Sequence, residues 1–146
     1  MKSVRSSLAW RATTGFCKAA YFTFYHGEAR SGLQPYTGFM LDYEISAPDA
    51  AELLRQKKTR FIDVREPWEV ATAQIEGSLA IPMGDVPARA HQELDPDERL
   101  VVFCHLGQRS MNVTVWLRNQ GFEQVQSMRG GIEAWSAEVD SKVPRY

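Results

Sequence analysis

Two short runs of mainly apolar residues constrain the fold of this chain more than any other feature. They span residues 60–64 and 100–103, and runs of this length are typical of strands buried on both faces of a sheet. Segments with the character of helices stand before, between and after them. Because strands that alternate with helices form parallel sheets covered on both faces, we expect a compact three-layer α/β domain.

The remaining elements follow from local signals. Ser46 and Asp49 stand at the spacing of a capping box, Pro48 suits an early helical position, and Gly121 suits the end of a helix. These signals and the apolar spacing predict helices over 50–57, 67–70, 86–91, 110–120 and 131–139. Further strands are predicted over 78–82 and 124–128.

The charge divides the chain near Met40. Residues 1–39 hold five basic residues against one acidic residue (net +4), and residues 40–146 hold 12 against 17 (net −5). We therefore expect a domain over 40–146 and a basic extension over 1–39. The extension has three interpretations: a targeting peptide, an ordered cover rich in aromatic residues, or a segment outside the functional unit, which we favour.

The composition excludes several classes of function. The 44% of hydrophobic and 24% of charged residues are typical of globular proteins, and a net charge of −1 gives no electrostatic reason to bind nucleic acid. Cys17 and Cys104 are too few for a disulfide scaffold, and no cluster stands at zinc-ligand spacing. No stretch approaches the ~18 apolar residues of a membrane helix. We expect no nucleic acid or membrane partner, and neither a metal nor an organic cofactor.

The segment after the second apolar run carries the candidate chemistry. Cys104 ends a strand, a short loop containing Gly107 follows, and a helix begins near Ser110. Ligands of parallel sheets bind at the carboxyl ends of strands, and the free N–H groups at a helix start attract negative charge. With the fixed positive charge of Arg109, these effects favour the thiolate of Cys104, which is the nucleophilic form.

The spacing within this loop limits what it can bind. Four residues separate Cys104 from Arg109, whereas tyrosine-phosphatase loops have five. The shorter ring of amides, turned inward at Gly107, suits the terminal sulfur of a persulfide better than a tetrahedral oxyanion. An inert buried cysteine is the plain alternative, but the combined pattern favours a reactive site.

Four segments of the chain, in this order, resemble signatures of the rhodanese family of sulfurtransferases. They are 61–66, 75–82, 104–110 and 129–135, and the likeness covers roughly residues 45–136. The resemblance implies a central parallel sheet and a double-displacement reaction. In that reaction Cys104 takes the outer sulfur of a small-molecule donor such as thiosulfate, holds it as a persulfide, and passes it to a thiophilic acceptor: cyanide, a thiol or a protein thiol.

The resemblance also implies roles for the other site residues. The loop amides stabilise the persulfide, and Arg109 and Ser110 fix the loop and support negative charge. Asp63 and Arg65, at the end of the neighbouring strand, support the site as an ion pair or loop anchor, and Glu66 caps the next helix. The binding loop consists of His105, Leu106, Gly107, Gln108, Arg109 and Ser110.

Two departures from the family's pattern affect substrate binding. His105 stands where the family often has an arginine that can hold thiosulfate, and residues 74–77 replace the common His-Ile-Pro-Gly. A histidine is only partly charged at neutral pH, so we expect weak or pH-dependent binding of thiosulfate.

Three other functions stay open from the sequence. The loop length argues against a phosphatase or arsenate reductase on the same fold, and the retained Cys104 argues against a non-catalytic regulatory module. A redox relay would need Cys17 as the resolving cysteine. We expect a cytoplasmic sulfurtransferase, with organellar targeting by residues 1–39 as the alternative.

Overall fold

A five-stranded parallel sheet forms the centre of the fold in the computed structural model, which describes residues 41–146. The strands are β1 (Glu44–Ile45), β2 (Arg60–Asp63), β3 (Leu79–Ala80), β4 (Leu100–Phe103) and β5 (Val125–Met128), in the spatial order β1-β5-β4-β2-β3. The predictions for residues 1–39 lie outside the described residues.

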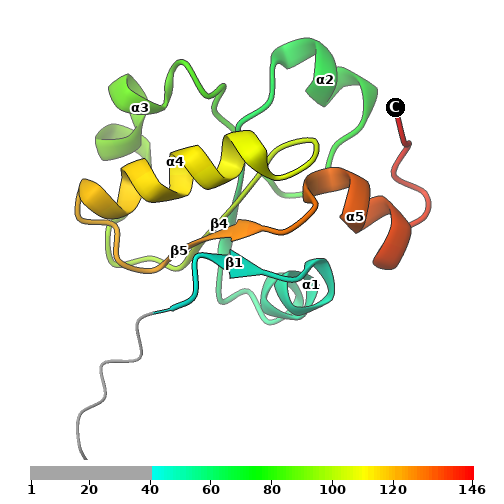
Figure 1. The fold of residues 1–146 in the computed structure, drawn as a ribbon, viewed down its shortest axis with the longest axis horizontal. Helices are drawn as coiled ribbons and strands as arrows, with labels where there is room; N and C mark the ends of the chain where they lie inside the picture. Colours follow the sequence, from blue (N-terminus) through cyan, green and yellow to red (C-terminus); the bar gives the residue numbers. More distant parts are fainter. Residues whose placement is uncertain (1–40) are drawn as a thin grey trace, which may run out of the picture. The chain divides into compact units, whose positions relative to one another are not determined.

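Residues 41–146 contain five helices, and four of them cover the two faces of this sheet, whereas α2 lies at its edge (Figure 1). They are α1 (Ala47–Arg55), α2 (Pro67–Thr72), α3 (Val86–Glu93), α4 (Gln108–Asn119) and α5 (Gly131–Glu138). α1 and α5 pack on one core, with Phe61 and Phe103, and α3 and α4 pack on the other, with Ile62 and Val102. Because successive strand residues point to opposite faces, each central strand feeds both cores. The expected three-layer α/β domain is confirmed.

The register of the two central strands places the site. Asp63 of β2 lies opposite Phe103 of β4, and the N–H of Val64 donates to the carbonyl of Phe103 at 3.0 Å. Both strands therefore end at the same level, so the segment after β2 begins beside Cys104, as the rule for carboxyl strand ends predicts.

Two helices begin earlier than the sequence predicts. α1 begins at Ala47 because Ser46 is its N-cap, whose hydroxyl accepts the N–H of Asp49 at 3.2 Å. α4 begins at Gln108, two residues before the predicted start, because Gly107 at φ +101° is its N-cap. A left-handed glycine lets the chain pass from the loop directly into the first turn.

The strand predictions differ at the sheet edges. The predicted strand over 78–82 is reduced to Leu79–Ala80, and β1 was not predicted at all. A strand of two residues has no hydrophobic pattern of its own, and β1 exists because Ile45 pairs with Met128 of β5.

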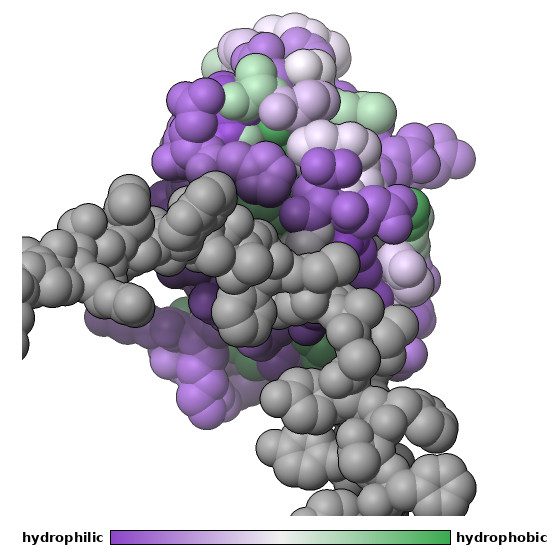
Figure 2. Space-filling view, turned by 90° about the vertical axis from the view of Figure 1, so that its left-hand side faces the viewer, coloured by the Kyte–Doolittle hydropathy of each residue, from purple (hydrophilic) through white to green (hydrophobic). Residues whose placement is uncertain are grey.

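The left-hand face of Figure 1, where α3 lies, is mainly hydrophilic wherever its atoms are coloured in Figure 2. The composition of α3 explains this surface, because Val86 and Ala90, spaced four residues apart, are the only buried residues of that helix. The coloured part of this face gathers no large apolar patch.

Candidate active site

The sulfur of Cys104 lies in a cradle formed by its own loop. Cys104 is a free thiol at the end of β4, and only 1% of the residue is exposed. The backbone N–H of Gly107 donates to its Sγ at 3.1 Å. The first N–H groups of α4 have no intrahelical acceptor, which leaves this end of the helix suited to an anion. The loop geometry agrees with the inward turn predicted at Gly107.

Ser110 ties the loop to the sheet below it. Its hydroxyl lies 3.6 Å from Sγ of Cys104, 3.0 Å from the carbonyl oxygen of Gly107 and 2.8 Å from the hydroxyl of Ser127 on β5. Ser110 and Ser127 are fully buried. A buried hydroxyl with several partners is held in place, so Ser110 fixes the first turn of α4 beneath the nucleophile. Ser127 carried no sequence signal, because a serine in a strand has no pattern.

Arg109 is bound by a carboxylate that no pattern in the sequence indicates. Its Nη1 and Nη2 donate to the two carboxylate oxygens of Glu69 on α2, at 2.6 and 2.7 Å. The hydrogen bonds from Arg109 lower the pKa of Glu69 to about 2, against the opposing effect of its burial. The pKa of Arg109 is raised, mainly by the same hydrogen bonds and further by the nearby Cys104. Arg109 therefore fixes the loop to α2.

Glu69 also takes part in the start of its own helix. Its carboxylate accepts the backbone N–H of Glu66 at 3.0 Å, within a capping box formed by these two residues. The expected role of Glu66 at the start of α2 is thus confirmed. The spacing of Glu66 and Glu69, on either side of Pro67, is a signal that could have identified Glu69 as a helix-start residue, but not as the partner of Arg109.

Asp63 and Arg65 form a buried ion pair beside the loop. Their exposed fractions are 1% and 0%, and Nη2 of Arg65 lies 2.6 Å from Oδ2 of Asp63. Arg65 also donates to the carbonyl oxygens of Glu69 at 3.3 Å and Ala73 at 2.7 Å, so it holds both ends of α2. Asp63 and Arg65 thus lie together as a buried ion pair at the start of the segment that leads into α2.

Tyr146 completes the site from the far end of the sequence. Its ring stacks on that of His105, with centroids 4.4 Å apart, and packs edge-on against Trp68. Its hydroxyl accepts a hydrogen bond from Nη1 of Arg65 at 2.6 Å and donates to Glu69 at 3.2 Å. Burial is the main cause that raises the pKa of Tyr146. No spacing in the sequence links residue 146 to this loop.

The first residues of α5 donate hydrogen bonds to the backbone of the loop. The N–H of Ile132 donates to the carbonyl of Cys104 at 2.8 Å, and the N–H of Glu133 donates to that of His105 at 3.3 Å. Gly131, at φ +57°, lies so close to these two carbonyls that a Cβ atom would overlap them. Gly131 therefore lets α5 approach the loop closely.

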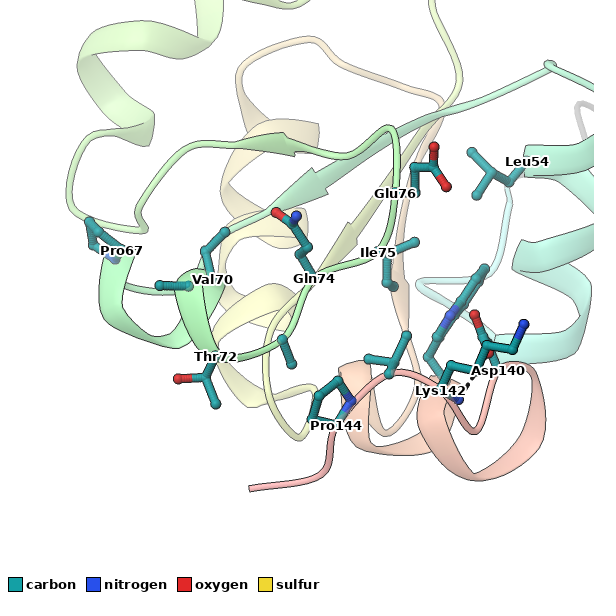
Figure 3. A pocket seen from close by; sticks show the side chains of 14 residues that line it. Leu54, Pro67, Val70, Thr72, Gln74, Ile75, Glu76, Asp140, Lys142 and Pro144 are labelled. Carbon is teal, nitrogen blue, oxygen red and sulfur yellow. Dashed lines mark hydrogen bonds between the residues drawn. The ribbon is translucent and has the colours of Figure 1, made fainter.

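A wide groove lies apart from this cradle (Figure 3). Val70, Gln74 and Ile75 line one side of it, and Lys142 and Pro144 line the other. Three of the four residues that replace the family's His-Ile-Pro-Gly, Gln74, Ile75 and Glu76, thus line a groove whose lining includes no residue of the loop 104–110. The size of a groove therefore does not identify the reactive centre of this protein, because the nucleophile Cys104 is nearly buried.

In the part of the chain that the structure describes, no three metal-binding side chains come together. In the same part, no helix has the length and apolar character needed to cross a membrane.

Comparison with known proteins shows the family. The family model of the rhodanese-like domain matches residues 46–138, and the chain belongs to this family. The thiosulfate sulfurtransferase GlpE of Pseudoalteromonas translucida is 34% identical over 101 residues, which cover 69% of this chain and 95% of that protein. The human single-domain sulfurtransferase TSTD1 superposes with a TM-score of 0.59 and 26% identity, over 66% of this chain and 97% of that one.

A longer relative shows the same domain in another setting. The rhodanese-like/PpiC domain-containing protein 12, chloroplastic, of Arabidopsis thaliana is 38% identical over 92 residues. The match covers 61% of this chain but only 31% of that protein. The shared part is therefore the rhodanese-like domain.

Proposed function

We propose that this protein is a sulfurtransferase that moves a sulfane sulfur from a donor such as thiosulfate to a thiophilic acceptor through a Cys104 persulfide. The observation that carries the proposal is the N–H of Gly107, which donates to Sγ of Cys104 at 3.1 Å within the loop of a rhodanese-like domain. Relatives with the name sulfurtransferase support the reaction class.

The reaction divides one difficult transfer into two easier ones. The Cys104 thiolate attacks the outer sulfur of the donor, the donor's bond to that sulfur breaks, and the leaving group departs with the electron pair. The terminal sulfur of the resulting persulfide then lies among the loop amides, which oppose its negative charge as an oxyanion hole would. A thiol, a protein thiol or cyanide attacks this sulfur and restores the Cys104 thiolate.

The geometry of Arg109 favours this reaction over phosphate hydrolysis on the same fold. Both of its terminal nitrogens donate to Glu69, so the guanidinium is occupied by a protein carboxylate. A loop that binds a phosphate dianion needs its cation for the ligand. We therefore propose no second function.

The proposal includes the domain over 40–146 as the functional unit and a reducing compartment, the cytoplasm, as its location. The chemistry requires a free thiol at Cys104, and cytoplasmic thiols are kept reduced. Truncation to Met40 should leave transfer activity unchanged. Fractionation of cells that express the full chain checks the location.

The test of the mechanism is the intact mass of the full chain after incubation with thiosulfate, and again after cyanide. We expect a gain of one sulfur atom that cyanide removes and that Cys104→Ser does not show. Cys17→Ser serves as the matched control, because it deletes the other cysteine of the chain and should load normally. Transfer activity retained in Cys104→Ser would disprove the persulfide mechanism.

A further inference from the structure

Within residues 41–146, the arginines on the two sides of the loop are paired with carboxylates of the protein. Arg109 is bound by Glu69, as described above. On the other side of the loop, Arg129 lies 3.3 Å from Glu44 in a hollow that Leu106 also lines. The charges around the cradle therefore cancel pair by pair. A dianion that enters from water finds no uncompensated positive charge among these pairs to replace its hydration.

The side chain at the position that could hold thiosulfate is also engaged in contacts with the protein. His105 stands at the place where the family often has an arginine, but its ring stacks on Tyr146 at 4.4 Å. Its Nε2 lies 4.0 Å from a carboxylate oxygen of Glu133, which also accepts from Nε of Arg145 at 2.6 Å. His105 thus forms a flat wall with Tyr146 beside the ion pair of Glu133 and Arg145, and this arrangement does not attract an anionic donor.

Two exposed apolar side chains belong to the surroundings of the nucleophile, one beside this wall and one within the loop. Trp68 packs edge-on against Tyr146 and is 66% exposed, and Leu106 in the middle of the loop is 63% exposed. Large apolar side chains left in water beside a reactive group are typical of sites that bind organic ligands. Because Cys104 itself is only 1% exposed, the transferable sulfur must enter the cradle while the rest of the donor stays at this surface.

We propose that the preferred sulfur donor is a persulfide on an uncharged organic carrier and not an inorganic dianion, an inference that rests on the proposed function. In its reaction the Cys104 thiolate attacks the outer sulfur of R–S–SH, and the bond between the two donor sulfurs breaks. R–S⁻ leaves with the electron pair, and Cys104 keeps the sulfur as a persulfide. One thiol is regenerated as the other is consumed, so no further oxidant or reductant takes part.

Two persulfides of matched length test the charge preference. They are those of 2-mercaptoethanol, whose carrier is uncharged, and of 2-mercaptoethanesulfonate, whose carrier bears a negative charge; the persulfide group itself is the same in both. The experiment measures the rate at which each adds one sulfur to the full chain in the Cys17→Ser background, where Cys104 is the remaining cysteine. We expect the uncharged persulfide to react about tenfold faster or more, the size of effect that one unit of charge has near a protein surface. Equal rates, or a faster anionic donor, would overturn the inference.

A variant that removes the carboxylate bound to Arg109 tests whether charge pairing causes the preference for an uncharged donor. Glu69→Gln keeps the shape of the side chain but frees the charge of Arg109. It should raise the rate with the sulfonate persulfide and with thiosulfate at least about fivefold relative to the uncharged persulfide. The matched control is Glu93→Gln, which removes a carboxylate that binds Arg89 in the same bidentate way on α3. An unchanged ratio in Glu69→Gln would contradict the inference.

Trp68→Ala tests the apolar surface separately, because an exposed side chain can be removed without disturbing the core. We expect it to slow loading by the uncharged persulfide about threefold or more, and to slow that reaction more than loading by thiosulfate. The same data separate the two proposals. If no donor loads Cys104, the proposed function fails, whereas fast loading by thiosulfate with no preference for the uncharged persulfide overturns only the donor class.

Discussion

Arg109 and Glu69, 40 residues apart in the chain, face each other as a bidentate pair with distances of 2.6 and 2.7 Å. The carboxylate is buried and the guanidinium is about one third exposed. This pair joins the loop that holds the nucleophile to the helix that follows the neighbouring strand. It therefore makes the loop's position depend on α2.

Arg109→Ala should weaken both stability and transfer. It leaves the buried Glu69 without its main partner, which costs about 1–2 kcal/mol in the free energy of unfolding once screening at the exposed guanidinium is allowed for. Loss of loop support should lower kcat/KM about tenfold or more. Urea denaturation and a thiocyanate assay measure the two effects. Arg89→Ala, which breaks an exposed pair on α3, should leave both stability and activity nearly unchanged.

Acid should destabilise the native protein through Glu69. Its pKa is about 2 in the folded chain and 4.5 as the ordinary value, so the folded state favours the ionised form. This contribution is fully present above about pH 4.5 and is lost as the pH falls towards 2. Between about pH 5 and 3, the free energy of unfolding should fall less steeply in Glu69→Gln than in the parent protein. Parallel pH profiles of the two proteins would contradict the assigned pKa.

Tyr146→Phe should separate the contribution of the stacked ring to stability from that of the hydroxyl group. The variant keeps the stacked ring on His105 but loses the hydroxyl that contacts Arg65 and Glu69, at a cost of about 0.5–1.5 kcal/mol in the free energy of unfolding. Thermal unfolding measures the loss. Tyr43→Phe is the control, since its hydroxyl makes no hydrogen bond within residues 41–146, and it should leave the melting temperature unchanged.

Gly131→Ala should be among the most damaging small substitutions at the site. Its φ of +57° is unfavourable for alanine, and the added methyl group would overlap the carbonyl oxygens of Cys104 and His105. We expect a loss of more than about 2 kcal/mol in the free energy of unfolding and a displaced loop with reduced transfer. Gly84→Ala, where no heavy atom lies within 4 Å, is the control and should be neutral within about 0.5 kcal/mol. Equal stability of the two variants would disprove the close approach of α5.

Most of the elements could be predicted because their signals are local. The strand over 100–103 was predicted with its exact bounds, and the helices differ mainly at their ends, where caps decide the first residue. The short strand β1 could not be predicted, since Ile45 is in a strand only through its pairing with Met128. Local backbone preference carries no information about such a partner.

The sequence by itself determined the strand-loop-helix segment, the cysteine at its start and the glycine that turns the loop. Those features depend on residues within a few positions of one another, so their pattern is visible in the chain. The tertiary structure decided which side chains surround the sulfur: Glu69 on Arg109, Tyr146 on His105 and Ser127 beneath Ser110. These contacts depend on the register of β2 and β4 and on the packing of α5, which bring distant segments to one edge of the sheet. Because the charge state and the surface of the site follow from those contacts, donor preference is a property of the folded protein.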